Sequence, residues 1–320
     1  MRLDEFVLDD SEKIILALRS LYQHNGFTRF RMEKFEKYDL YAQNKDFLVS
    51  ERIITFTDTD GKLMALKPDV TLSVIKYLHD EPEKLQKLCY NENVYRVSKG
   101  TGSFHEIMQI GLECVGKVDA ACIGEVLLLA AKSLGLVAAS YVLEISHLDI
   151  LRKLLGDALR DEKAQSAALK HVTEKNVAGV AALCREAGAG AEETQALLAL
   201  MRLYGDAAEV LPRLRTLCAG KGLDTELDEL AGVVAALADG GFSRCVTLDF
   251  SAVSNMNYYN GILFAGFVEG LPESVLNGGQ YDKLMRKMGK ASKAIGFAVY
   301  LDRLERIGDT NNGGVVFQNA

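Results

Sequence analysis

One stretch of the chain, Cys89 to Gly116, carries polar residues at a spacing that could bind a small ligand. Its pattern is typical of two strands joined by a turn at residues 99–102, where two glycines permit a tight reversal. Side chains alternate along a strand, so Gln109, Gly111 and Glu113 share one face of the second strand. A polar group on each side of a bare glycine predicts the floor of an amino-acid-sized site. The alternative is a half-buried strand with a solvated outer face.

Three other positions carry groups that could bind a ligand. Asp69 follows a proline and precedes an apolar helical pattern, which makes it a helix N-cap or a ligand-binding carboxylate. Tyr258 and Tyr259 precede an apolar strand, and alternation predicts that one phenol packs while the other reaches a pocket. Arg303 could hold a phosphate or a carboxylate, or could pair with an acidic neighbour.

The segments that position these residues alternate between strand and helix patterns. We expect a helix capped by Ser11 and ended by Asn25-Gly26, a strand over residues 27–32 and a hairpin over residues 53–67. A further helix begins at Asp119 and closes at Gly135, and a strand follows at residues 141–146. The chain closes with a strand at 244–250, a glycine turn at 277–282 that leads into a helix, and a strand or turn at 294–304.

Residues 151–239 differ in character from the rest. They are rich in alanine, leucine, lysine and glutamate and show no clear strand pattern, which predicts a helical insertion. We expect its short helices to break near Gly188, Gly205 and Gly220. The remainder, residues 1–150 and 240–320, would form one core.

Composition excludes several classes of protein. The 320 residues are 48% hydrophobic and 25% charged, with a net charge of −7, which argues against a broad nucleic-acid-binding surface. Six cysteines are scattered without a CxxC pair or metal spacing, so buried free thiols in a reducing cytoplasm are expected. We also expect no metal and no cofactor. We expect no membrane span, because no apolar run approaches about 20 residues.

Six motifs in order resemble the histidyl-tRNA synthetase catalytic core. They are Lys67-Pro68-Asp69-Val70-Thr71, Tyr95-Arg96, Gln109-Ile110-Gly111-Leu112-Glu113, Asn257-Tyr258-Tyr259, Gly278-Gly279-Gln280-Tyr281-Asp282 and Gly296 with Asp302-Arg303-Leu304. The resemblance implies an α+β fold, the class II synthetase antiparallel sheet flanked by helices, with a helical insertion. It also implies a histidine-binding site made of Asp69, Arg96, Gln109, Glu113, Tyr258 and Tyr259.

The departures from that family concern its chemistry. The synthetase motif has a glutamate two residues after the arginine, where Ser98 follows Arg96 here. Ser254 and Gln280 stand where the synthetase has arginines. Adenylation builds negative charge on phosphorus that fixed cations stabilise, and one such donor is worth roughly 10²–10³ in rate. The chain ends at Ala320, so we expect no anticodon-binding domain and no tRNA partner.

A binding site without this chemistry resembles the ATP phosphoribosyltransferase regulatory subunits. That resemblance implies a non-catalytic, cytoplasmic chain that forms dimers and joins the short-form catalytic subunit in a hetero-octamer. It would activate that subunit and mediate histidine inhibition in the first step of histidine biosynthesis. The alternatives are a short enzyme that activates an amino acid with ATP, favoured by Arg96 and Arg303, and a structural dimerisation module with a vestigial pocket.

Overall fold

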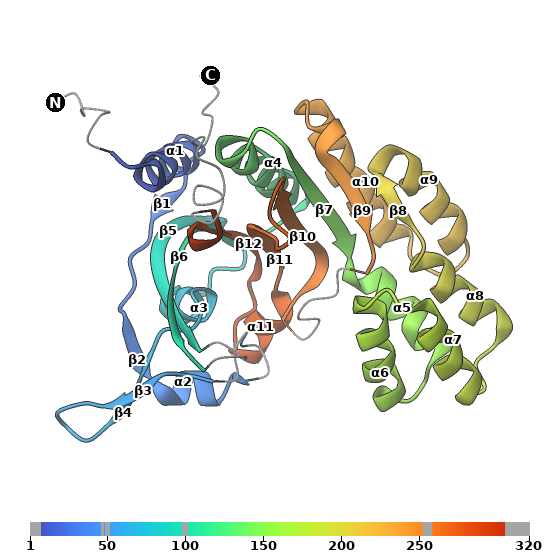
Figure 1. Ribbon diagram of the computed structural model, residues 1–320, viewed down its shortest axis with the longest axis horizontal. Helices are drawn as coiled ribbons and strands as arrows, with labels where there is room; N and C mark the ends of the chain where they lie inside the picture. Colours follow the sequence, from blue (N-terminus) through green and yellow to red (C-terminus); the bar gives the residue numbers. More distant parts are fainter. Residues whose placement is uncertain (1–7, 46–47, 49–51, 98–101, 252–257, 305–320) are drawn as a thin grey trace.

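A mixed, mainly antiparallel sheet of nine strands organises the part of the chain that the structure describes, and helices cover it (Figure 1). The structure is a computed structural model that describes residues 8–45, 48, 52–97, 102–251 and 258–304. The expected α+β fold is confirmed. In spatial order the strands are β1 (Thr28–Arg29), β5 (Gln86–Val97), β6 (Phe104–Gly116), β12 (Lys293–Tyr300), β11 (Leu276–Gln280), β10 (Asn260–Val268), β7 (Tyr141–His147), β9 (Val246–Asp249) and β8 (Tyr204–Asp206).

Helices cover the two faces of this sheet differently. On one face, α1 (Asp10–His24), α4 (Ala120–Val137) and α10 (Asp224–Asp239) join the largest core cluster, together with Ile110, Leu112 and Cys114 of β6. On the other face lie α3 (Thr71–Tyr77) and α11 (Asp282–Lys287), whose apolar residues form two smaller clusters. Residues 301–304 add a helical turn after β12. The candidate site lies on the second face.

The central hairpin has the predicted alternation. In its antiparallel register, Tyr90 is paired with Gly111 and Leu88 with Glu113. Gln109 and Glu113 share a face, but they are only 3% and 2% exposed. The alternative of a solvated outer face is therefore wrong for residues 109–115, where Thr71 of α3 and Tyr281 contact Glu113, although His105 at the start of the strand is exposed. The predicted turn at 99–101 lies outside the described residues.

A second, small sheet contains the other predicted hairpin. Strand β4 (Leu63–Leu66) lies between β2 (Phe35–Lys37) and β3 (Thr55–Thr57), and all pairs are antiparallel. Gly61 in the β3–β4 turn has a φ of +80°, the conformation that favours glycine. The hairpin over residues 53–67 is confirmed, and α2 (Tyr38–Ala42) follows β2.

Three predicted boundaries are wrong. Asp9, not Ser11, caps α1, because its carboxylate accepts the Glu12 backbone N–H while Glu12 returns the bond in a capping box. Helix α4 does not close at Gly135 but runs on to Val137, since packing of its last turn outweighs the cost of about 1 kcal/mol for a glycine in a helix. The strand expected over 27–32 is only the two residues of β1.

Helix α4 also bears on the expectation about membrane spans. Among the described helices it is the one long and apolar enough, by length and composition, to cross a membrane. It is mostly buried between the sheet, α1 and α10, and Asp119 caps it by accepting the Cys122 backbone N–H. Its apolarity therefore has a packing explanation.

The glycine turn expected at 277–282 is instead strand β11. Neither Gly278 nor Gly279 has a positive φ. A Cβ on Gly278 would lie 2.5 Å from the Gly296 carbonyl oxygen and from the Phe264 ring, so glycine is needed here for close strand packing. The following helix is confirmed as α11.

The expected helices between the two halves of the sheet are confirmed as α5 (Leu148–Ala158), α6 (Glu162–Thr173), α7 (Val177–Glu186), α8 (Ala191–Leu200), α9 (Ala207–Cys218) and α10. Sequence reasoning missed one strand, β8, which pairs with β9. The strand expected from Arg244 begins later, because Ser243–Cys245 form a 3₁₀ turn. Side chains of this segment share the main core cluster with the sheet, and its division from the core at 151 and 239 stays a prediction.

Candidate functional site

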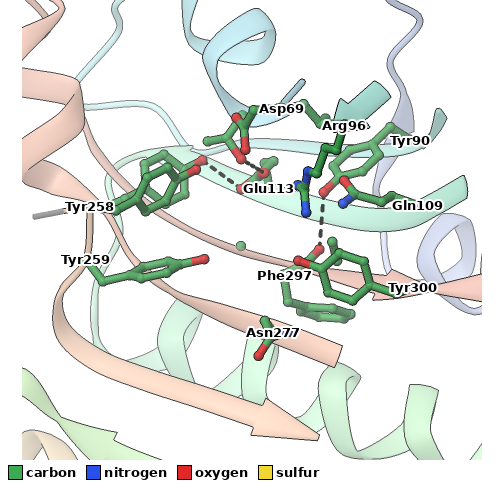
Figure 2. Close-up of a pocket in the computed structure, with 15 residues that line it drawn as sticks. Asp69, Tyr90, Arg96, Gln109, Glu113, Tyr258, Tyr259, Asn277, Phe297 and Tyr300 are labelled. Carbon is green, nitrogen blue, oxygen red and sulfur yellow. Dashed lines mark hydrogen bonds between the residues drawn. The ribbon is translucent and has the colours of Figure 1, made fainter. Parts of the chain in front are cut away.

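A cavity on the α3 face of the sheet brings together the predicted site residues of the central hairpin (Figure 2). Its empty volume, counted into the open solvent at its mouth, is about 480 Å³. The residues that line it come from six segments: Asp69, Val70, Thr71, Tyr90, Arg96, Gln109, Glu113, Tyr258, Tyr259, Asn277, Tyr281, Gly296, Phe297, Ala298 and Tyr300.

Glu113 is the most constrained side chain of this cavity. Its Oε1 accepts a hydrogen bond from Thr71 Oγ1 at 3.1 Å, and its Oε2 accepts one from Tyr281 Oη at 2.7 Å. A Cβ on Gly296 would lie 1.7 Å from Oε2, so only glycine fits beside the carboxyl group. Burial raises the Glu113 pKa to about 8, against the lowering effect of the two hydroxyl donors. Near neutral pH this group can hold or release a proton.

Asp69 is both a helix-capping residue and a cavity residue. Its Oδ1 accepts the backbone N–H of Leu72 in the first turn of α3 at 3.0 Å, and the side chain lines the cavity beside Glu113 (Figure 2). Burial raises its pKa, and the Leu72 N–H and the nearby Arg96 guanidinium oppose that shift. Asp69 therefore makes the predicted contact with the first turn of the helix and also lines the cavity, while ligand binding by its carboxyl group stays a prediction.

Arg96 supplies a positive charge to the same cavity. Its Nε donates to the Pro68 carbonyl oxygen at 3.1 Å, which fixes the guanidinium next to Asp69. Among the described residues, no ion pair at salt-bridge distance neutralises it. Figure 2 shows the Gln109 amide pointing into the cavity near Arg96 and Tyr300. Two carboxyl groups, a guanidinium and an amide thus converge on one enclosed space.

Both tyrosines of the pair Tyr258-Tyr259 line the cavity, with ring centroids 4.5 Å apart. The expectation that they point to opposite sides is wrong. They precede β10 in a non-strand conformation, where strand alternation does not apply. Their burial raises the pKa of both phenols, so each stays a neutral hydrogen-bonding group. Residues 254–257 lie outside the described residues. They include Ser254, which stands where the synthetase has an arginine.

The bare floor predicted at Gly111 is covered by another aromatic residue. Tyr90 lies opposite Gly111 on β5, and a Cβ on Gly111 would meet the Tyr90 hydroxyl at 2.6 Å and the Phe297 carbonyl oxygen at 2.2 Å. Sequence reasoning missed six lining residues that build walls: Thr71, Tyr90, Asn277, Tyr281, Phe297 and Tyr300. The cross-strand position of Tyr90 and the motif position of Tyr281 were signals that could have identified them.

Arg303 lies outside this cavity. Its Nε lies 3.6 Å from Glu273 Oε2, its guanidinium donates to the Ser274 carbonyl oxygen, and it stacks 4.4 Å from the centre of the Tyr300 ring. It lines a second, wider hollow with Arg96, His105, Glu106 and Asp302. Of the two roles considered, the pairing with an acidic neighbour is confirmed.

Gln280 also lies outside the cavity. Asn277 and Tyr281 face the ligand space, whereas Gln280 is on the opposite face of β11, where its amide donates to Glu229 Oε1 of α10 at 3.2 Å. The substitution at position 280 therefore removes no charge from the walls of this cavity.

The donor set suits an organic ligand better than a metal ion. Within the described residues, no group of three or more His, Cys, Asp or Glu side chains could hold a metal. Carboxyl groups that accept hydrogen bonds from an ammonium and a guanidinium that pairs with a carboxylate are what a free amino acid requires. The arrangement has the chemistry of a zwitterion-binding pocket.

Comparison with known proteins agrees with this fold. Residues 7–304 match the histidyl-tRNA synthetase family. A curated ATP phosphoribosyltransferase regulatory subunit from Geobacillus thermodenitrificans (strain NG80-2) is 31% identical over 276 residues, which cover 84% of this chain and 70% of that protein.

Two solved structures are also similar. The first is an ATP phosphoribosyltransferase regulatory subunit/histidyl-tRNA synthetase from Bacillus halodurans, with 25% identity and a TM-score of 0.80, covering 96% of this chain and 81% of that one. The second, an ATP phosphoribosyl transferase (HisG:HisZ) complex from Thermotoga maritima, is 19% identical with a TM-score of 0.72, covers 91% of this chain and 97% of that one, and shows the shared fold. The chain belongs to the ATP phosphoribosyltransferase regulatory subunits, within the histidyl-tRNA synthetase family.

Proposed function

We propose that this chain is the non-catalytic regulatory subunit of a short-form ATP phosphoribosyltransferase and binds free histidine in the cavity of Glu113. The observation that carries the proposal is that the buried carboxyl groups of Asp69 and Glu113 and the half-buried guanidinium of Arg96 line one cavity. Buried charges are costly without partners, so a zwitterion that satisfies both signs gains strong, charge-assisted hydrogen bonds. Family membership supports the regulatory role.

Each end of histidine has a matching group in the cavity. Asp69 or Gln109 accepts from the α-ammonium group, and Arg96 faces the α-carboxylate. Glu113 and a tyrosine hydroxyl, from Tyr258 or Tyr259, hold the two imidazole nitrogens. Each of these groups is buried or half-buried, so an analogue that leaves one unpaired loses affinity by about 1–3 kcal/mol.

Feedback follows from linkage between the pocket and the assembly. Histidine inhibits only if it binds the inhibited assembly more tightly than the active one, and the ratio of the two affinities sets the strength of inhibition. The chain activates the catalytic subunit, forms dimers and joins it in a hetero-octamer in the cytoplasm, without binding tRNA. These are properties that we extend to it from its resemblance to the family.

We also propose that this chain has lost the ability to activate an amino acid with ATP. Arg303, which could have held a phosphate, is engaged by Glu273, Ser274 and Tyr300. Arg96 and Arg303 nevertheless border the same second hollow, which keeps the alternative of an amino-acid-activating enzyme testable. Histidine-dependent exchange of pyrophosphate into ATP by the pure chain would favour that alternative.

The test combines co-purification with turnover. The chain is mixed with a short-form catalytic subunit, and phosphoribosyl transfer is measured with and without it and with added histidine. We expect complex formation, a faster reaction and inhibition by histidine, with inhibition weakened in Glu113→Gln. Glu226→Ala, at a partly exposed position of α10 outside the cavity, is the matched control. Unchanged turnover in the complex, or no histidine binding by calorimetry to either the chain or the complex, would contradict the proposal.

A further inference from the structure

Two segments that carry pocket tyrosines end against helices α5 and α10, outside the pocket. Tyr259 immediately precedes β10, and Tyr281 immediately follows β11. At the start of β10, Ile262 pairs with His147, which is the last residue of β7 and the N-cap residue of α5. Side chains from the two helices contact the chain within two residues of these tyrosines.

The first link comes from α5. Arg152 Nη2 donates to the Tyr259 carbonyl oxygen at 2.7 Å, and its Nη1 donates to Asp149 Oδ1 at 2.7 Å. Asp149 Oδ2 in turn accepts the backbone N–H of Gly261 at 2.9 Å. The Arg152–Asp149 pair therefore holds the chain on both sides of Asn260 and fixes the direction in which Tyr259 enters the cavity.

The second link comes from α10. Glu229 Oε1 accepts from Gln280 Nε2 at 3.2 Å, and its Oε2 lies 3.0 Å from His147 Nε2. Gln280 Oε1 accepts the backbone N–H of Ile262. Gln280 precedes Tyr281, whose hydroxyl donates to Glu113 in the pocket. Gln280 and Tyr281 are adjacent residues whose side chains lie on opposite faces of the sheet. They therefore join α10 on one face to the carboxyl group of Glu113 in the pocket on the other.

The two links meet at Gly261. This residue has a φ of +55°, and a Cβ there would lie 2.0 Å from Gln280 Oε1. The backbone held by α5 and the side chain held by α10 are therefore in direct contact. A displacement of either helix must move the tyrosine segments or break these hydrogen bonds.

We propose that Arg152 and Glu229 are positioning residues for the pocket, and that they couple its occupancy to the position of helices α5 and α10. The identity of the ligand, histidine, rests on the proposed function; the positioning role does not. Coupling is reciprocal, so a partner that shifts α5 or α10 changes ligand affinity by the same factor by which the ligand changes partner affinity. The region that departs from the synthetase at Gln280 then has a regulatory use.

Hydrogen exchange of the full chain without ligand tests the positioning role. Glu229→Ala should speed exchange of the amides of residues 276–281 about three- to tenfold, the value of one or two net hydrogen bonds. Arg152→Ala should do the same for residues 258–263. Glu229→Gln keeps an acceptor for Gln280 and should restore slow exchange, which separates positioning from misfolding. Glu226→Ala on α10 and Lys153→Ala on α5 are controls on the same helices, and exchange equal to these controls would overturn the proposal.

Exchange at saturating histidine tests the coupling. In the unmodified chain, amides of α5 and α10 should slow when calorimetry shows that the pocket is filled. In Glu229→Ala, the slowing should remain in α5 and disappear in α10. No slowing in either helix of a saturated chain would overturn the coupling. If calorimetry shows no histidine binding, the proposed ligand is wrong, and the ligand-free measurement alone decides the role of Arg152 and Glu229.

Discussion

Two neighbouring hollows that share Arg96 differ in what their charged groups are doing. In the cavity of Glu113, carboxyl groups and a guanidinium converge on an enclosed space. In the wider, more open hollow of Arg303, the arginine is already held by Glu273, Ser274 and Tyr300. One site keeps its polar groups directed at a ligand, while the other satisfies its cation within the protein. The proposed binding of an amino acid therefore depends on the first hollow, whose polar groups are not satisfied in this way.

The most disruptive test changes only the first hollow. Gly296→Ala would place a Cβ 1.7 Å from Glu113 Oε2. We expect loss of measurable histidine binding by calorimetry and a decrease of about 1–3 kcal/mol in the free energy of unfolding. Gly156→Ala on α5, where nothing lies within 4 Å of an added Cβ, should be neutral or slightly stabilising. Normal binding by Gly296→Ala would show that the pocket adapts more than its packing implies.

A second test uses the titration of Glu113 in the first hollow. Its folded pKa of about 8 lies above its ordinary value near 4.5, so between these values the folded state holds a proton that the unfolded state lacks. Stability should therefore fall as pH rises from about 5 to 8, by up to about 1.4 kcal/mol per pH unit from this group. Denaturant unfolding of the wild type and Glu113→Gln measures this. Parallel curves for the two proteins would contradict the assignment.

The third test contrasts the two arginines directly. Arg96→Ala should weaken histidine binding about 10- to 100-fold, since it removes a charge-assisted partner of the ligand carboxylate. Arg303→Ala should change affinity less than about twofold and stability by at most about 1 kcal/mol, because its ion pair is partly exposed. Calorimetry and thermal unfolding give both values. Equal losses of affinity would mean that the ligand spans both hollows.

The smallest expected effect is that of one hydroxyl group. Tyr281→Phe removes the donor to Glu113 Oε2 and should lower histidine affinity about three- to tenfold while raising the Glu113 pKa further. Tyr204→Phe, at an exposed tyrosine, is the control. In our proposal the ionised carboxylate of Glu113 accepts from the imidazole. Calorimetry should therefore show a larger deficit at pH 7 than at pH 9, because a higher pKa reduces the ionised fraction relatively more at pH 7. A deficit independent of pH would point to lost packing alone.

The sequence predicted the local features of this fold correctly and misjudged those that depend on neighbours. The alternation of Gln109 and Glu113 on β6 follows from strand geometry alone, and the structure has it. The glycines of β11 gave a turn prediction because nothing in the local sequence shows that Gly296 and Phe264 crowd them. Tyr258 and Tyr259 were expected on opposite sides because strand alternation was applied to two residues that precede β10 and are not in a strand.

The sequence by itself determined the order of the motifs, the strand faces of the central hairpin and the presence of acidic, basic and phenolic groups. Only the tertiary structure decided which of them meet. Tyr281 reaches Glu113 from 168 residues away, and Gln280 faces α10 while Arg303 is held by Glu273. Side-chain periodicity is a property of a few adjacent residues, whereas a pocket is made by contacts between distant segments that periodicity does not encode.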